Sequence, residues 1–264
     1  MVQFVHAVLR NALQNAVREE LVVRNVAKLV QISNPDYRAG RGLSLAEAHR
    51  VLQASEAEPL HALYVLALYL GLRRAELLGL RWEDVVLDPE PGRYPLLEIN
   101  QTLQRVGGEL QFVPPKTRTS RRTVPLPPVC VRVLKDHAKR QAEQRAVAGS
   151  DWREHGLVFP SRVGTPMEPD NLRRSWDRIK KAAGVELRFH DLRHTCVTLL
   201  LDLGVPPHIV REIAGHSALD VTMTIYAHAS LDEKYRALSK LDDRLAAVPL
   251  SSDSRQTGNE KADA

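Results

Sequence analysis

The stretch that decides the fold reads Arg188-Phe189-His190-Asp191-Leu192-Arg193-His194-Thr195 and is followed by Ala214-Gly215-His216-Ser217 and Ile225-Tyr226. It places His190, Arg193, His216 and Tyr226 in a fixed order within 40 residues. A second stretch, Gly71-Leu72-Arg73-Arg74-Ala75-Glu76, adds an arginine on an apolar helix. Arginine binds a phosphate through paired hydrogen bonds and keeps its charge. A tyrosine beside two such arginines and two imidazoles is a candidate covalent nucleophile toward a phosphodiester.

Five separate motifs, in order and spacing, carry a resemblance to one family. They are GLRRAELLGLRWEDV at 71–85, PPKTRTSRRTVPL at 114–126, RFHDLRHT at 188–195, AGHS at 214–217 and IYAH at 225–228. Together they resemble the tyrosine recombinase, or phage integrase, family across residues 1–247. The resemblance implies a site-specific DNA recombinase that cleaves and rejoins double-stranded DNA through a 3′-phosphotyrosyl intermediate, with no cofactor.

Two arginines and a lysine supply the positive charge that this reaction needs. The resemblance makes Arg73 and Arg193 the two phosphate-binding forks, with Glu76 as the residue that orients Arg73. The ordinary alternative for Arg73 is an ion pair with Glu76, and Arg74 could serve in its place. Lys116 takes the role of the general acid that protonates the leaving 5′ oxygen, since an ammonium on a flexible stem suits that task. Its alternative is a lysine that contacts the DNA backbone.

Histidines and a tyrosine complete the implied active site. The resemblance gives His190 a part in proton transfer and phosphate binding, and gives His216 a hydrogen bond to the scissile phosphate. Tyr226 is the expected nucleophile, and because a phenol has a pKa of about 10, nearby cations must favour the phenolate. Asp191 and His194 are expected to support the site, His194 by packing between helices. Without the family motifs, His216 would be interpreted as an exposed loop histidine and Tyr226 as a core residue.

The spacing of His190 and His194 also occurs in zinc-binding helices. That signature has Glu directly after the first histidine, where this chain has Asp191, and it needs a third ligand nearby. The sequence contains neither a carboxylate cluster with metal-ligand spacing nor a Walker-type glycine-rich loop. Since the phosphotyrosine bond conserves the energy of the cleaved bond, we expect neither a metal nor a nucleotide cofactor.

Basic residues gather in two places along this chain of 264 residues, which has a formal net charge of +5 and a pI of about 9.3. Residues 116–122 hold four cations and no acid, and residues 171–181 hold five cations and one Asp. Such patches suit a polyanion such as DNA, and a solvated face is the ordinary alternative. The expected DNA contacts are Arg118, Arg121, Arg122, Arg173 and Arg174.

Cysteine content and hydropathy predict the compartment. Cys130 and Cys196 are far apart and form no CxxC motif, which favours a reducing cytoplasm. The longest apolar run, residues 63–72, is too short to span a bilayer, and the N-terminus lacks the pattern of a secretory leader. We therefore expect a soluble cytoplasmic protein, associated with the nucleoid, with no membrane partner.

Hydrophobic periodicity predicts a mainly α-helical chain with one small antiparallel β-sheet, an α+β class that matches the recombinase catalytic domain. Ser44 and Glu47 form a capping box that starts one helix near Leu45. Strands are predicted around 97–103, 110–112 and 122–126, with a hairpin turn at Gly107-Gly108. The other predicted helices are 3–22, 60–70, one from about 73, 128–147, 169–182, 190–203, 206–214, 218–226 and 231–247.

The resemblance also predicts the domain organisation. Residues 1–34 would be the C-terminal remnant of a helical core-binding domain, 35–43 a linker, 44–248 the catalytic domain and 249–264 a disordered tail. Because the first half of the core-binding domain and any arm-binding domain are absent from this sequence, we expect this chain to be impaired in full recombination. Residues 231–247 carry an apolar stripe at helical spacing. The resemblance implies that this helix docks into a neighbouring subunit of a homo-tetramer on DNA, with packing on its own domain as the alternative, and it adds accessory DNA-bending proteins as possible partners.

Two other functions fit part of the pattern. Residues 199–217, two helical pieces around Gly204-Val205-Pro206, resemble a helix-turn-helix, which would suit a DNA-binding regulator without catalytic activity. A type IB topoisomerase uses similar catalytic residues to relax supercoils only. Loss of covalent DNA adducts in Tyr226→Phe separates an enzyme from a regulator, and relaxation of any supercoiled plasmid by a monomer identifies a topoisomerase.

Overall fold

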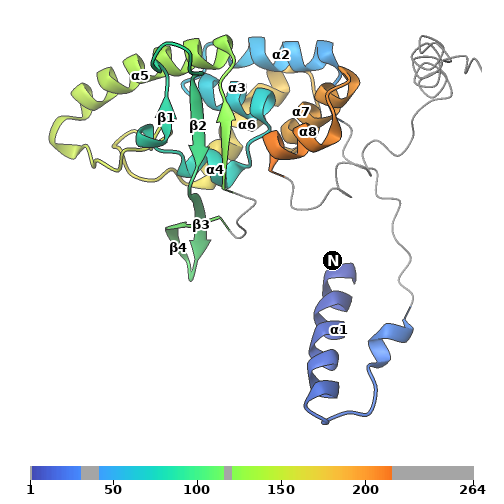
Figure 1. Ribbon diagram of the computed structural model, residues 1–264. Coiled ribbons are helices and arrows are strands. Elements are labelled where there is room, and N and C mark those ends of the chain that lie inside the picture. The colour runs from blue at the N-terminus through green and yellow to red at the C-terminus, as the bar shows by residue number, and fades with distance from the viewer. Residues whose placement is uncertain (1, 31–41, 116–120, 216–264) are drawn as a thin grey trace, which may run out of the picture. The chain divides into compact units, whose positions relative to one another are not determined.

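The structure is a computed structural model that describes residues 2–30, 42–115 and 121–215. The chain divides into two compact units, Met1–Arg41 and Gly42–Ala264 (Figure 1). Three of the predicted segments, the helices at 218–226 and 231–247 and the tail at 249–264, lie outside the described residues. The roles assigned to the two units in the predicted domain organisation stay predictions.

The first unit contains helix α1 (Val2–Arg18) and the short 3-10 helix η1 (Val26–Leu29). α1 ends four residues earlier than predicted, because Glu20 adopts a left-handed backbone with φ 58° and turns the chain. Asn25 then ties the returning segment to the helix by donating from Nδ2 to the carbonyl oxygen of Arg10 at 2.8 Å. This unit is thus a helix with a short return segment.

The second unit is mainly helical, and its helix boundaries follow local signals. The predicted capping box is present: Glu47 N donates to Ser44 Oγ at 3.3 Å, and Ser44 N donates to Glu47 Oε2 at 2.8 Å. α5, α6 and α8 each carry proline in the first turn, where its missing N–H costs nothing. The described α-helices are α2 (Leu45–Ser55), α3 (His61–Leu70), α4 (Arg74–Gly79), α5 (Pro128–Ala148), α6 (Pro169–Ala183), α7 (Asp191–Asp202) and α8 (Pro207–Ala214).

The strands form two antiparallel sheets instead of the single sheet predicted from the sequence. β1, which was not predicted, pairs with β2, and β2 pairs with β5, while β3 and β4 form a separate hairpin. The division falls at Asn100-Gln101, whose side chains donate to Asp84 Oδ1 and to the carbonyl oxygen of Gly79, each at 2.8 Å. The strands are β1 (Val85–Val86), β2 (Leu96–Ile99), β3 (Thr102–Val106), β4 (Glu109–Val113) and β5 (Arg122–Pro125).

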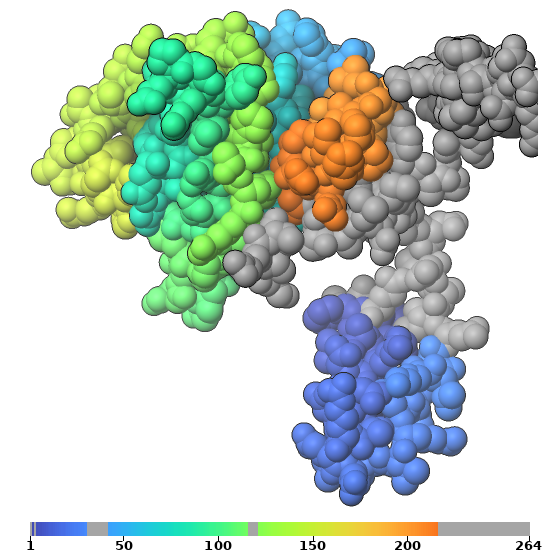
Figure 2. Space-filling model, viewed as in Figure 1, coloured from blue at the N-terminus to red at the C-terminus, as the bar shows by residue number. Residues whose placement is uncertain are grey.

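Helix α3 lies at the centre of the hydrophobic core, as its apolar sequence predicts. Leu63, Tyr64 and Leu66 are fully buried, and α3 contacts α5 on one side and α7 on another. Each such side chain contributes about 1.5–3 kcal/mol to folding through burial. α8 contacts both α7 and β5, and Figure 2 shows this orange end of the described chain packed beside the green sheet region. Among the described residues, no helix combines the length and apolar character needed to cross a membrane.

A close approach of backbones fixes α4 against the β3–β4 hairpin. A Cβ atom on Gly79 would lie 2.9 Å from Leu103 N and 3.0 Å from the Cα of Thr102. Only glycine fits there without moving backbone atoms, so the last residue of α4 is held directly on β3. The N-terminus of the same helix carries Arg73, and α4 is thereby a rigid base for the residues around that arginine.

Candidate active site

Arg73 is held by its own helix terminus. Gly71 ends α3 with φ 61°, and Arg73 then occupies the extended N-cap position of α4. Its backbone N donates to Glu76 Oε2 and its Nη1 donates to Glu76 Oε1, both at 2.8 Å. The ion pair considered as an alternative for Arg73 is therefore present, and it coexists with a side chain that is 34% exposed. Glu76 thus fixes one edge of the guanidinium, while part of the Arg73 side chain stays exposed.

Glu76 is a buried carboxylate shared by two arginines. Its side chain is 2% exposed, and Arg122 of β5 donates from Nη1 to Oε1 and from Nη2 to Oε2, both at 3.0 Å. Burial acts to raise the pKa of Glu76, but the hydrogen bonds and charge of Arg122, and then those of Arg73, outweigh it and keep the pKa below its ordinary value. The carboxylate therefore stays charged at neutral pH and pairs with both neighbouring cations.

Arg193 reaches the same place from helix α7. Its side chain is 2% exposed, and Nη1 donates to the carbonyl oxygen of Gly71 at 2.7 Å and also to that of Ala214. Burial, together with repulsion from Arg73, lowers the pKa of Arg193 to about 9. The guanidinium remains protonated at neutral pH, so two arginines from different helices bring positive charge to one region.

The C-terminal end of α8 is bound by three arginines at three consecutive carbonyl oxygens. Arg122 Nε donates to Ile213 O at 2.9 Å, Arg193 Nη1 to Ala214 O, and Arg73 Nη2 to Gly215 O at 2.6 Å. The last carbonyls of a helix lack partners within the helix and carry partial negative charge, so cations are favoured there. These bonds join α4, α7, α8 and β5 at one point, directly before His216 in the sequence.

His190 and His194 lie together at the start of α7. His190 is the exposed residue that precedes the helix, and its ring centroid is 5.3 Å from that of His194 at an angle of 89°. Partial burial of the rings lowers the pKa of both histidines, and the charge of Arg193 adds to that effect. Because their pKa values are lowered, the two imidazoles are neutral near pH 7, a state that can accept or pass a proton. Asp191 accepts hydrogen bonds from Arg188, from its backbone N at 2.9 Å and from its Nη2 at 3.0 Å.

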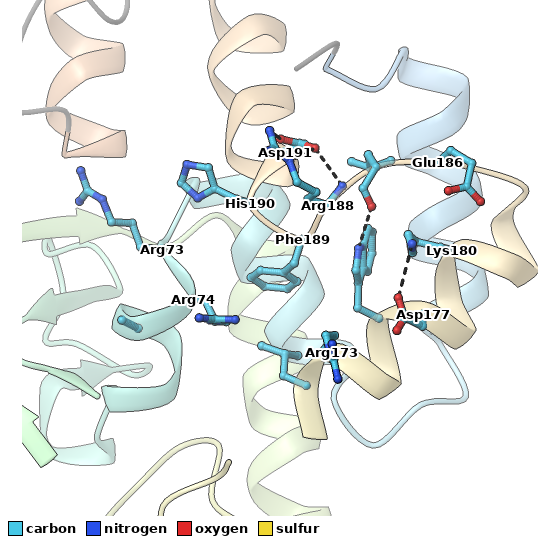
Figure 3. A pocket seen from close by; sticks show the side chains of 14 residues that line it. Arg73, Arg74, Arg173, Asp177, Lys180, Glu186, Arg188, Phe189, His190 and Asp191 are labelled. Carbon is cyan, nitrogen blue, oxygen red and sulfur yellow. Dashed lines mark hydrogen bonds and ion pairs between the residues drawn. The ribbon is translucent and has the colours of Figure 1, made fainter. Parts of the chain in front are cut away.

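A cleft of about 840 Å³ opens beside Arg73 and His190. Figure 3 shows these two side chains at one end, with Arg74, Phe189 and Arg173 further along. The charged lining is positive overall, since it contains Arg73, Arg74, Arg173, Lys180 and Arg188 against Asp177, Glu186 and Asp191. Leu172, Trp176, Leu187 and Phe189 supply apolar wall. A cleft with this charge suits a phosphodiester backbone.

Four of the expected site residues lie outside the described residues: Lys116, Arg118, His216 and Tyr226. The flanking positions are described, because β4 ends at Val113 before Lys116 and α8 ends at Ala214 before His216. The roles of these four residues stay predictions.

The expected DNA contacts differ in where they lie. Arg121 is exposed, and Arg173 and Arg174 are exposed on α6, but these two line different clefts. Arg173 faces the cleft beside Arg73, while Arg174 lines a second cleft of about 560 Å³. Arg122 does not fit the expectation of a DNA contact, because both terminal nitrogens of its guanidinium donate to the buried carboxylate of Glu76. In the sequence Arg122 looks like its basic neighbours, because its partner, Glu76, lies 46 residues away and leaves no local pattern.

Metal ligation finds no support in the described ranges. Within residues 2–30, 42–115 and 121–215, no group of three or more His, Cys, Asp or Glu side chains is placed to hold a metal ion. His190 and His194 therefore lack a third described ligand of these types. Both cysteines are free and buried, and burial raises the pKa of each thiol to about 12, which leaves them unreactive.

Comparison with known proteins assigns the chain to a family. The model of the phage integrase family matches residues 42–233, which includes every motif described above. The chain belongs to the phage integrase family. An integrase of Streptomyces ambofaciens is 39% identical over 233 residues, covering 85% of this chain and 58% of the relative. A XerC-like tyrosine recombinase of Caldanaerobacter subterraneus subsp. tengcongensis is 36% identical over 205 residues, covering 75% of this chain and 52% of the relative.

Solved structures show the same fold for this family member. The Tn1549 transposon integrase, in complex with a circular intermediate DNA, matches with a TM-score of 0.75 and 21% identity, covering 91% of this chain and 78% of that chain. The XerA recombinase matches with a TM-score of 0.57 and 20% identity, covering 80% of this chain and 66% of that chain. The present chain spans just over half the length of the two sequence relatives.

Proposed function

We propose that this protein is a site-specific DNA recombinase that cleaves and rejoins duplex DNA through a 3′-phosphotyrosyl intermediate. The observation that carries the proposal is the convergence of Arg73 and Arg193, from two helices, beside the exposed imidazole of His190 and a positively charged cleft. Membership of the phage integrase family supports it. The Streptomyces relative is named an integrase, and the structure of the Tn1549 integrase was solved in complex with DNA.

The chemistry follows from charge placement. Arg73 and Arg193 bind the non-bridging oxygens of the scissile phosphate, and their positive charge stabilises the additional negative charge of the transition state. The phenolic oxygen of Tyr226 forms a bond to phosphorus as the bond from phosphorus to the 5′ oxygen breaks. The 5′ oxygen receives a proton from Lys116, and His190 relays the proton lost by the phenol. Attack by a 5′ hydroxyl on the phosphotyrosine reverses these steps and rejoins a strand.

Preorganisation explains why these residues suit that chemistry. Glu76 fixes Arg73 from one edge, and Gly71 O and Ala214 O fix Arg193, so neither fork has to be ordered when phosphate arrives. A fixed donor of this kind contributes about 10²–10³ to the rate of the chemical step. The three arginine contacts also hold the carbonyl groups of Ile213, Ala214 and Gly215, the residues that precede His216 in the sequence.

The proposal extends to assembly and location. We expect four copies to act together on two DNA sites, with accessory DNA-bending proteins as possible partners, in the cytoplasm at the nucleoid. Residues 1–34 are proposed to belong to a second DNA-binding domain that helps to enclose the duplex. Two related structures support a DNA partner: one is a lambda integrase dimer bound to a core site, and the other is a XerH recombinase bound to its difH substrate.

A pool of duplexes with many different sequences tests the activity and finds the target sequence in one experiment. Each duplex has a random central sequence and a nick on one strand, so that cleavage just upstream of the nick releases a short oligonucleotide and traps the protein. Wild type should become covalently attached to a subset of the duplexes, and this attachment should survive denaturation in SDS. Sequencing the attached DNA then gives the preferred site. If wild type binds the pool yet yields no adduct while Tyr226→Phe binds equally well, the protein is a DNA-binding regulator.

A further inference from the structure

Arg122 makes contacts that differ in kind from those of a DNA-contacting arginine. Its side chain is 7% exposed, and the guanidinium faces Glu76 with two hydrogen bonds of 3.0 Å each. Its Nε donates to Ile213 O at 2.9 Å. One side chain of the sheet therefore joins the first turn of α4 to the last turn of α8. Paired hydrogen bonds between a planar fork and a carboxylate also fix orientation, which a lysine cannot reproduce.

Two of the proposed catalytic groups depend on this bridge. Glu76 binds Arg73 by two hydrogen bonds of 2.8 Å, so any shift of the carboxylate shifts the phosphate fork. The last carbonyls of α8 precede His216 directly, so any shift of that helix end shifts the backbone that leads to His216. Arg122 contacts the supports of both groups, and these supports come from elements far apart in sequence.

Gly215 gives a second, independent indication that this space is tightly filled. It has φ +68°, and a Cβ atom there would lie 2.5 Å from Arg122 Nη1 and 2.7 Å from Arg122 Cζ. Its carbonyl oxygen accepts from Arg73 Nη2 at 2.6 Å. A side chain at this position would push the guanidinium of Arg122 away from Glu76. The absence of a side chain at 215 is thus a condition for the bridge.

We propose that Arg122 is a positioning residue for strand cleavage, which fixes Arg73 through Glu76 and fixes the backbone before His216 through Ile213. The proposal rests on the proposed function, because the phosphate fork that Arg122 serves is the one assigned there. It replaces the expectation that Arg122 contacts DNA. Supporting residues of this type typically change activity by about 10–100-fold, although they touch neither substrate nor reacting atoms.

The test uses the full chain and the duplex recovered from the nicked pool. Arg122→Lys, Arg122→Gln and Gly215→Ala are compared with wild type for single-turnover cleavage at saturating protein, for DNA affinity and for the slope of affinity against salt. A positioning residue should lower the cleavage rate by about 10–100-fold while affinity and salt slope stay at wild-type values. Gly215→Ala should show the same pattern, and Arg122→Lys should be the mildest of the three.

Arg145→Gln is the matched control, because Arg145 also pairs with a glutamate, Glu154, at 3.0 Å but lies on α5. It should cleave at the wild-type rate. A salt slope reduced by about one unit in the Arg122 variants would identify a phosphate contact and overturn the proposal. Wild-type cleavage rates in folded Arg122 variants would overturn it, as would loss of folding in all three variants, which would make Arg122 a core residue. Failure of wild type to form any adduct would instead refute the proposed function.

Discussion

Replacing Glu76 by Gln removes one charge and little volume from the centre of the site. The wild-type carboxylate accepts four hydrogen bonds: from Arg73 N and Nη1, and from Arg122 Nη1 and Nη2. A glutamine keeps one acceptor oxygen and turns an NH₂ group toward the arginines. Two charge-assisted bonds at about 1.5–3 kcal/mol each give a loss of about 3–6 kcal/mol. Removing one partner of a buried ion pair costs about 3–5 kcal/mol, which agrees.

Solvent screening determines how this loss of stability divides between the Arg73–Glu76 pair and the Arg122–Glu76 pair. Arg73 is 34% exposed, so its pair with Glu76 is weakened by water, whereas Arg122 is 7% exposed and loses most. We therefore expect Glu76→Gln to lower the free energy of unfolding by about 3–5 kcal/mol at pH 7. All three tryptophans lie in the second unit, so urea unfolding followed by tryptophan fluorescence reports on the unit that contains the site.

The pH dependence of this difference has a defined sign. Because the pKa of Glu76 is lowered in the folded protein, its contribution is complete above the unfolded pKa, which is about 4.3. That contribution is lost as the pH falls through the folded pKa. The gap between wild type and Glu76→Gln should thus stay constant from pH 7 down to about 4.3 and narrow below it. Glu154→Gln, which removes a partly exposed carboxylate, should cost about 0–1 kcal/mol. A gap no larger than that of Glu154→Gln at pH 7 would refute the account of Glu76.

Three further predictions concern the forks, the backbone and the C-terminal segment. Arg193→Lys should reduce single-turnover cleavage by about 10²–10³-fold with little change in DNA affinity, because lysine keeps the charge but loses the fork; equal losses would make Arg193 a backbone contact. Gly71→Ala should destabilise the second unit by about 1–2 kcal/mol in urea unfolding, since φ is 61° and Cβ would meet Cys196 Sγ at 3.3 Å; an unchanged midpoint would contradict this. Deletion of 231–264 should leave cleavage of single sites measurable but abolish pairing of two sites in a native gel, whereas unfolding would place that segment in the core.

Local signals allowed much of the fold to be predicted from the sequence. The capping box at Ser44, the apolar run of α3 with Gly71 after it, and the prolines in the first turns of α5, α6 and α8 each depend on neighbouring residues. The division of the strands into two sheets could not be predicted, because β2 pairs with β5 across the intervening hairpin. Pairing at such separation leaves no periodic pattern in the chain.

The candidate site could likewise be predicted only where local motifs mark its residues. Arg73, Glu76, His190 and Arg193 carry motif signals, and the structure brings them to one region. The burial of Arg122 was not predictable, because a basic run such as 116–122 has the same composition whether each arginine faces solvent or a buried carboxylate. Gly215 occurs in the AGHS motif, but its contact with Arg122 depends on the packing of α8 against β5.

Peptide mapping of the trapped adduct tests the central claim most directly. Wild type is trapped on the duplex recovered from the nicked pool, the DNA is digested to a short remnant, and the linked peptide is sequenced by mass spectrometry. The account predicts a nucleotide joined through its 3′ phosphate to Tyr226 and a free 5′ hydroxyl on the released oligonucleotide. A link to any other residue, or a link through a 5′ phosphate, would contradict it.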